Sequence, residues 1–233
     1  MDARRRLWMI MATSAEVDWR LGAAAVAAAV DVPAALVIIG TPVTEDDPVR
    51  PRMAAIVELS AADRLTLEQA RDLVLAVRQA YGVVLVAAPA GPLVPVGSPD
   101  WALADLVAAL GAAALVVTGP GPDAVNHTTL ALGALAGHGI SASVITVGAG
   151  DDFDEAALPV TPIGRVPADH PADFAGAAGW FHPALVAAAE PALPEKPTVS
   201  GRTFVLGLLG IFVLLVVLVC GVAWLGASPG HPS

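Results

Sequence analysis

Short, uninterrupted apolar runs alternate along the chain with longer stretches in which apolar positions recur at helical spacing. Five runs of four to seven residues have the continuous Val, Ile and Leu content of strands buried on both faces: Leu7–Ala12, Ala34–Ile39, Val83–Ala87, Ala114–Val117 and Ser143–Val147. The remaining periodic stretches predict five helices: Glu16–Val30, Leu67–Ala80, Asp100–Leu110, Ala124–Gly137 and Ala172–Ala189. This alternation predicts an α/β domain with a parallel sheet flanked by helices.

Local signals mark where several of these helices begin and end. Thr66 and Gln69 have the spacing of a capping box, which predicts a helix that begins at Leu67. The triplet Ser98-Pro99-Asp100 predicts that the next helix begins at Asp100. Three glycines near the expected helix ends suit the left-handed conformation that such positions commonly need: Gly82, Gly111 and Gly139.

The segment Phe204–Leu225 contains 22 residues and no charged side chain. At about 1.5 Å per residue, a helix of this length spans about 33 Å, which matches a bilayer core of about 30 Å. The segment therefore predicts a transmembrane anchor over residues 203–226. A proline-rich linker (187–202) connects the anchor to the folded body (1–186), and a short tail (227–233) follows it.

Charged residues near the anchor predict its orientation. Lys196 and Arg202 precede the anchor and the tail has no Lys or Arg, so the positive-inside rule places the body in the cytoplasm. At the other end of the chain, the apolar run after Arg4-Arg5-Arg6 is too short for a signal peptide, and Glu16 soon follows it. We therefore expect a single-pass protein of the inner (cytoplasmic) membrane, with its tail outside.

Net charge and cysteine content exclude two classes of protein. The 233-residue chain has a formal net charge of −10, which argues against nucleic-acid binding because that function needs a basic face. Its single cysteine, Cys220, forms neither an internal disulfide nor a cysteine-rich zinc module. Histidines at positions 138, 170, 182 and 231 show no metal-ligand spacing, so we expect no metal site.

Several motifs resemble the dethiobiotin synthetase family. The stretch Ala114–Ile145 is similar to the C-terminal half of that family through Val116-Val117-Thr118, Gly121 and Asn126-His127-Thr128. Three further segments also match: the strand and loop VVLVAAPAGPLVPVG, the triplet Ala104-Asp105-Leu106 and the late strand Ile163–Pro167. The resemblance extends over roughly residues 7–186, with a shortened stretch at Thr44–Ala62. It implies a P-loop NTPase-type fold, a homodimer, and ATP- and Mg-dependent ligase chemistry in biotin biosynthesis.

The phosphate loop departs from the family pattern G-T-x-T-x-V-G-K-T. In the corresponding stretch, Thr13 and Glu16 fit, but the glycine is Asp18, the lysine is Trp19 and the metal-binding threonine is Arg20. A P-loop needs backbone N–H groups and a lysine around the phosphates, and a hydroxyl on the metal. Asp18 instead brings a carboxylate, and its alternative role is a helix-terminal charge. Arg20 offers a positive charge in one alternative, but a guanidinium does not ligate magnesium.

Other positions implied by the resemblance have also lost their chemistry. The family's second-strand lysine falls on Val37, and its acidic metal ligand falls on Ala87. Asp46 or Asp47 is the alternative source of a carboxylate for the metal. The asparagine that reads adenine in the family is absent near Val147–Gly148.

A turn before one helix retains a possible ligand-binding remnant. Gly121, Asn126 and His127 correspond to the helix N-terminus that binds the substrate's carboxylate in the family. Asp123 replaces a glycine there, and we expect its side chain to cap the helix and repel a second carboxylate. The alternative is a retained structural turn with Asn126 buried or capping. An acidic cluster at Asp151, Asp152, Asp154 and Glu155 indicates either a cation site or a solvated loop.

Two functional hypotheses follow. The first is a membrane-anchored, catalytically inactive relative that acts as an interaction or regulatory module, with no cofactor, an unidentified protein partner and no nucleic acid. The second is an active, membrane-tethered dethiobiotin synthetase that uses ATP and Mg. A MinD-like membrane NTPase is a third alternative, but it also requires the phosphate-loop lysine.

Overall fold

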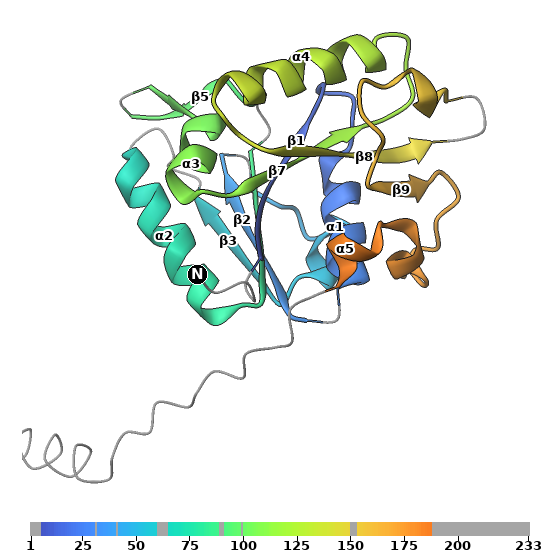
Figure 1. The fold of residues 1–233 in the computed structure, drawn as a ribbon. Coiled ribbons are helices and arrows are strands. Elements are labelled where there is room, and N and C mark those ends of the chain that lie inside the picture. The colour runs from blue at the N-terminus through green and yellow to red at the C-terminus, as the bar shows by residue number, and fades with distance from the viewer. Residues whose placement is uncertain are drawn as a thin grey trace, which may run out of the picture. The chain divides into compact units, whose positions relative to one another are not determined.

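Seven parallel strands form the central sheet, in the order β3-β2-β4-β1-β7-β8-β9 (Figure 1). The computed structural model describes residues 6–30, 32–40, 42–59, 65–88, 91–98, 100–149 and 153–187. In these residues the strands are β1 (Arg6–Ala12), β2 (Ala34–Ile39), β3 (Ala55–Leu59), β4 (Val83–Ala87), β7 (Ala113–Thr118), β8 (Ala142–Ala149) and β9 (Gly164–Pro167). A separate antiparallel pair joins β5 (Pro95–Gly97) to β6 (Trp101–Ala102).

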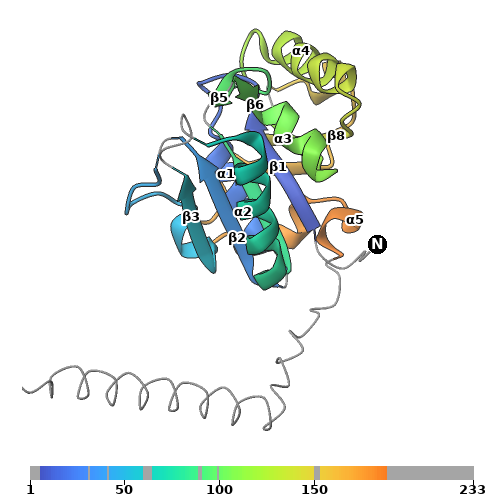
Figure 2. The same ribbon diagram turned by 90° about the vertical axis from the view of Figure 1, so that its left-hand side faces the viewer.

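Helices cover both faces of the sheet (Figures 1 and 2). The helices are α1 (Trp19–Ala29), α2 (Leu67–Ala80), α3 (Leu103–Leu110), α4 (Ala124–Gly137) and α5 (Pro183–Val186), with short 3₁₀ turns η1 (Arg50–Arg52), η3 (Glu155–Ala157) and η4 (Ala177–Trp180). Alternate strand residues face opposite layers, so Trp8 and Ile10 pack with α1, η4 and α5, and Met9 and Met11 pack with α2, α3 and α4. The parallel α/β fold expected from the alternation is confirmed.

Several elements have the bounds that the sequence predicts, namely β2, β4, α2 and α4. The capping box of α2 is present, because Thr66 Oγ1 accepts from Gln69 N at 3.2 Å and Thr66 N donates to Gln69 Oε1 at 3.0 Å. Gly111 and Gly139 adopt the expected left-handed conformation, with φ of 58° and 69°. Gly82 does not, because α2 ends at Ala80 and its C-cap residue, Tyr81, is already extended.

Three predicted helix boundaries are wrong. The first helix begins at Trp19, not Glu16, because Asp18 caps it and the preceding residues form a turn. The third begins at Leu103, not Asp100, because Trp101–Ala102 pairs with β5. The helix expected over 172–189 is replaced by η4 and α5, because Phe174 (φ 56°) and Gly176 (φ 79°) are left-handed.

The sequence pattern does not predict β3, which lies inside the shortened stretch after β2. Only Leu59 of this edge strand is buried, so β3 lacks the continuous apolar run of the central strands. Its neighbour β2, by contrast, is buried along its whole length.

No helix within the described ranges combines the length and apolar content needed to cross a bilayer. The predicted anchor (203–226), the tail and all but the first residue of the linker lie outside those ranges.

Candidate functional site

A pocket of about 450 Å³ lies at the carboxyl ends of three neighbouring strands. It is lined by the loop between β1 and α1 (Thr13–Asp18), the loop between β7 and α4 (Gly119–Asp123), and Val147 and Gly148 of β8. Ligands of open α/β sheets bind at this edge. The fold therefore brings together the three stretches that the resemblance marks as phosphate loop, substrate turn and base-reading position.

The predicted remnant residues are not all in the pocket. Thr13, Glu16, Gly121 and His127 line it. Asn126 is exposed in the first turn of α4 and is absent from the described lining, so it is not buried and does not line the pocket.

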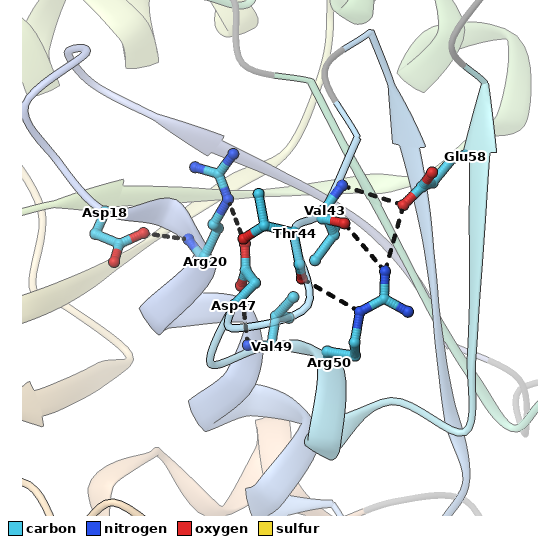
Figure 3. A network of polar contacts seen from close by, with 8 residues as sticks. All are labelled: Asp18, Arg20, Val43, Thr44, Asp47, Val49, Arg50 and Glu58. Atoms are coloured by element: carbon cyan, nitrogen blue, oxygen red, sulfur yellow. Dashed lines mark hydrogen bonds and ion pairs between the residues drawn. The ribbon is translucent and has the colours of Figure 1, made fainter.

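Asp18 is the N-cap of α1, where its Oδ1 accepts a hydrogen bond from Arg20 N at 3.0 Å (Figure 3). The cap satisfies one of the N–H groups that a helix start leaves free. Asp18 therefore has the helix-terminal role that was the alternative prediction for it. The carboxylate of Asp18 thus occupies a backbone N–H group of the helix start that the resemblance aligns with the phosphate loop.

Trp19, which the resemblance aligns with the family's lysine, is a core residue. It is 5% exposed and belongs to the cluster between α1 and the sheet. The guanidinium carbon of Arg20 lies 4.8 Å from its ring centroid, within cation–π range. Of the eleven residues of α1, eight are buried, so this helix is tightly packed against the sheet.

Arg20 directs its charge to the loop that follows β2. Its Nε lies 2.8 Å from Asp47 Oδ2, and the Asp47 side chain is 5% exposed (Figure 3). The other Asp47 oxygen, Oδ1, accepts from Val49 N at 3.0 Å. Both carboxylate oxygens of Asp47 are therefore engaged within the protein, by Arg20 and by the backbone of its own loop.

A second arginine, Arg50, contacts both the loop between β2 and β3 and the edge strand β3. Arg50 donates to the carbonyl oxygens of Val43 (3.0 Å) and Thr44 (3.2 Å), and its Nη2 lies 3.8 Å from Glu58 Oε1 (Figure 3). The same Glu58 oxygen accepts from Val43 N at 3.1 Å. The loop between β2 and β3 is thus fastened to α1 by Arg20 and to β3 through Glu58.

The pocket is acidic. Glu16, Asp18 and Asp123 contribute carboxylates, and no lysine or arginine occurs in its described lining. Two prolines in the second loop, Pro120 and Pro122, lack the N–H donors that a phosphate cradle uses. Bringing the negative charges of a nucleotide close to these carboxylates is electrostatically unfavourable.

The expected side-chain cap of α4 is wrong. Asp123 occupies the N-cap position, but its exposed carboxylate makes no capping hydrogen bond. Its backbone carbonyl accepts from His127 N at 2.8 Å, in the ordinary helical pattern. The carboxylate thus remains at the mouth of the pocket and adds to its negative charge.

Beneath the pocket, three threonine hydroxyls connect the loops. Thr128 donates to the carbonyl of Ala124 at 2.6 Å, and its oxygen lies 3.0 Å from Thr118 Oγ1. Thr13 Oγ1 lies 3.4 Å from the same Thr118 oxygen. Thr118 and Thr128 are fully buried. These motif residues therefore tie β1, β7 and α4 together, a role that the motif alone did not reveal.

The remaining predicted positions are structural. Val37 lies inside β2 and Ala87 ends β4, and both are fully buried apolar residues. In the acidic cluster, Asp151 and Asp152 lie outside the described residues. Glu155 accepts from Thr146 at 2.7 Å and lies 3.4 Å from Arg165 Nε. No group of metal-ligating side chains occurs in the described part of the chain.

Known proteins share part of this chain's sequence and its fold. No protein-family model matches the chain. It is 38% identical over 103 residues to the ATP-dependent dethiobiotin synthetase BioD of Mycolicibacterium vanbaalenii, a match that covers 44% of this chain and 45% of the relative. It is 43% identical over 67 residues to the protein of the same name from Mycobacterium avium, covering 29% and 30%. The chain thus spans less than half the length of these curated relatives.

Among solved structures, the MinC:MinD cell division protein complex of Aquifex aeolicus superposes with a TM-score of 0.52 at 14% identity, covering 77% of this chain and 88% of that one. This likeness concerns the fold alone. The chain has the fold of P-loop NTPases, and part of its sequence is similar to dethiobiotin synthetases.

Proposed function

We propose that this protein is a catalytically inactive relative of the dethiobiotin synthetases, anchored in the membrane and acting as an interaction or regulatory module. The observation that carries the proposal is the composition of the pocket at the carboxyl ends of β1, β7 and β8, where nucleotides bind in P-loop proteins. Acidic side chains line it, its helix is capped by Asp18, and the lysine position holds the buried Trp19.

The residues that the resemblance requires for phosphoryl transfer are replaced both at the phosphate-binding positions and at the metal-binding positions. That reaction depends on phosphate-binding cations and a metal acting as a set. Here the lysine and metal-hydroxyl positions hold Trp19 and Arg20, and Arg20 is paired with Asp47. Ala87 offers no carboxylate. We therefore expect no cofactor.

The first prediction is that the purified chain does not bind ATP. Isothermal calorimetry with ATP and Mg is expected to give only heats of dilution, because the pocket presents carboxylates to the phosphates. A dethiobiotin synthetase run in parallel serves as the positive control. Micromolar, Mg-dependent binding would overturn the proposal.

Active dethiobiotin synthetase is the second candidate, because the sequence similarity to that enzyme reaches 38% over 103 residues. This candidate predicts that the chain rescues growth of a dethiobiotin-requiring strain. A MinD-like NTPase agrees with the fold, but it too needs the missing lysine. Growth rescue and ATP binding together separate all three hypotheses.

The membrane proposal rests on the uncharged segment Phe204–Leu225. We propose that residues 203–226 span the inner membrane once, with the domain in the cytoplasm and the tail outside, because Lys196 and Arg202 flank the segment on the domain side.

Helix α4 supports a homodimer as one interaction. Its 14 residues include no Asp, Glu, Lys or Arg, although the chain has a net charge of −10. Leu130 is 62% exposed on it. A Cβ at Gly133 or Gly137 would meet nothing within 4 Å, so packing inside the monomer does not explain these helical glycines. Gly133, in the interior of the helix, costs about 1 kcal/mol relative to alanine.

We propose that two copies pair through α4, with Leu130 of each copy against the glycines of the other. A twofold interface joins identical surfaces, and an uncharged face lets two acidic chains approach.

The second prediction is that Leu130→Glu yields a monomer in light scattering under conditions where the unmodified chain is a dimer. The control Leu73→Glu, on α2 where Leu73 is 40% exposed, leaves the dimer intact. A monomeric unmodified chain, or a dimer in the Leu130 variant, would contradict the α4 interface.

A further inference from the structure

The two ends of α4 carry exposed side chains of opposite chemistry. Asp123 precedes the helix, and its carboxylate makes no capping hydrogen bond. His138 follows the last helical residue and is also exposed. Its Nδ1 lies 3.0 Å from the carbonyl oxygen of Ala134. This contact assigns the hydrogen of the neutral ring to Nδ1, so that Nε2 holds the lone pair.

Asp123 and His138 lie on the same side of α4 as the exposed Leu130. Positions 123, 127, 130, 134 and 138 are separated by three or four residues, the spacing that places side chains on one side of a helix. Along the helix axis, however, Asp123 and His138 are about 22 Å apart, because each residue adds about 1.5 Å. They therefore do not contact each other within one chain.

A second copy of the chain brings these two residues together. In the α4 interface proposed above, Leu130 of each copy contacts Gly133 of the other. The two positions lie level with each other only if the helices run antiparallel, because a parallel twofold pair places identical residues level. Position 138 of one copy then lies beside position 125 of the other, close to Asp123. The twofold axis keeps both residues on the same side of the helix pair and repeats their contact at the other end.

The protonation state of the imidazole decides whether this contact is attractive. In the neutral ring, the Nε2 lone pair faces the carboxylate, and two acceptors repel each other. The protonated ring instead donates from Nε2 to the carboxylate, in a charge-assisted hydrogen bond. It also places a positive charge between two chains that each have a net charge of −10. Histidine is the side chain whose charge ordinarily changes between about pH 5 and pH 8.

The surroundings of this contact contain few other titratable groups. Strands β7 and β8 pack against α4, and neither contains a titratable side chain. Within α4 the titratable residue is His127, one turn from Asp123 on the same side. The loop between β1 and α1 brings Glu16 and Asp18 to the pocket that Asp123 also lines. Three carboxylates at one pocket favour a cation at its mouth.

We propose that the partner subunit's His138, in its protonated form, binds Asp123 across the α4 interface. The partner thereby supplies a cation to the mouth of a pocket whose described lining contains no lysine or arginine. The dimer is held more tightly as the pH falls. This inference rests on the proposed α4 homodimer, and the experiments below separate the two.

The test measures the dissociation constant of the dimer by analytical ultracentrifugation of the full chain at pH 5.5 and pH 8.0. We expect binding at least about threefold tighter at pH 5.5, because each dimer gains two ion pairs. Falling pH also lowers the negative charge of the whole chain, so variants isolate the pair. His138→Gln and Asp123→Asn each lose the additional strengthening. The matched control His170→Gln retains it, because His170 stacks on Phe174 on the opposite face of the sheet.

A double-mutant cycle identifies the two partners. At pH 5.5 we expect the effects of Asp123→Asn and His138→Gln on the dissociation constant to be coupled by at least about threefold, and at pH 8.0 to be independent. The two residues are too far apart to interact within one chain, so coupling reports contact between copies. His138→Lys, with a charge at both pH values, keeps the tight dimer at pH 8.0. Absence of coupling at pH 5.5, or a pH effect that His127→Gln abolishes and His138→Gln leaves, would disprove the pair.

Leu130→Glu separates this inference from the interface itself. If this variant is a monomer while Asp123→Asn and His138→Gln match the unmodified chain at both pH values, the α4 dimer forms without the pair and only this inference is wrong. If the unmodified chain is a monomer at both pH values, or Leu130→Glu remains a dimer, the α4 interface and this inference are both wrong.

Discussion

Changing Asp18, Trp19 and Arg20 together to Gly, Lys and Thr is expected to unfold the domain in large part, without creating a nucleotide site. Trp19 is 5% exposed in the core between α1 and the sheet. Truncating a buried tryptophan typically costs about 3–5 kcal/mol, and burying a lysine ammonium adds to that cost. Domains of this kind have total stabilities of about 5–15 kcal/mol, so the loss removes much of the margin.

Urea and thermal unfolding followed by circular dichroism measure this effect, and calorimetry with ATP and Mg checks for binding. Trp19→Phe is the matched control, because it keeps an aromatic ring in the core and is expected to cost much less. Asp18→Gly alone removes the cap and costs only a few tenths of a kcal/mol. If the triple variant is as stable as the unmodified chain and binds ATP, the loop has the backbone conformation of a P-loop and the prediction is wrong.

Replacing Arg20 with alanine is expected to destabilise the protein by about 3 kcal/mol. The Asp47 side chain is 5% exposed and lies 2.8 Å from Arg20 Nε, so the variant leaves a buried carboxylate without its ionic partner. Val49 N still donates to that carboxylate, but one hydrogen bond does not replace the cation. Arg20 itself is 30% exposed, which keeps the effect near the lower end for buried pairs.

A double-mutant cycle tests this pair. The variant Arg20→Ala with Asp47→Asn is expected to recover part of the lost stability, because a neutral amide needs no counter-charge. Arg71→Ala, at an exposed position on α2, is the control and changes stability by less than about 0.5 kcal/mol. If Arg20→Ala is as stable as the control, the ion pair does not hold the loop between β2 and β3.

The location of the site could be predicted from the sequence, but the contacts between its side chains could not. The departures at Asp18, Trp19 and Arg20 are visible in the sequence because the surrounding motif fixes their positions. The pairing of Arg20 with Asp47 is not visible, because 26 residues lie between them and the shortened stretch after β2 offers no motif. The Asp123 cap failed for a related reason, since a residue at the N-cap position does not have to direct its side chain at the helix.

The sequence by itself determined the elements whose signals are local. The apolar runs of β2 and β4 reflect burial on both faces, and the capping box of α2 uses residues only three apart. The edge strand β3 and the start of α3 depended on pairing with distant strands, so local patterns missed them. Only the tertiary structure placed Trp19 in the core and joined Arg6 to the carbonyls of α5, about 180 residues away in the chain. Such contacts depend on how the crossovers bring elements together, and no local pattern along the sequence records that.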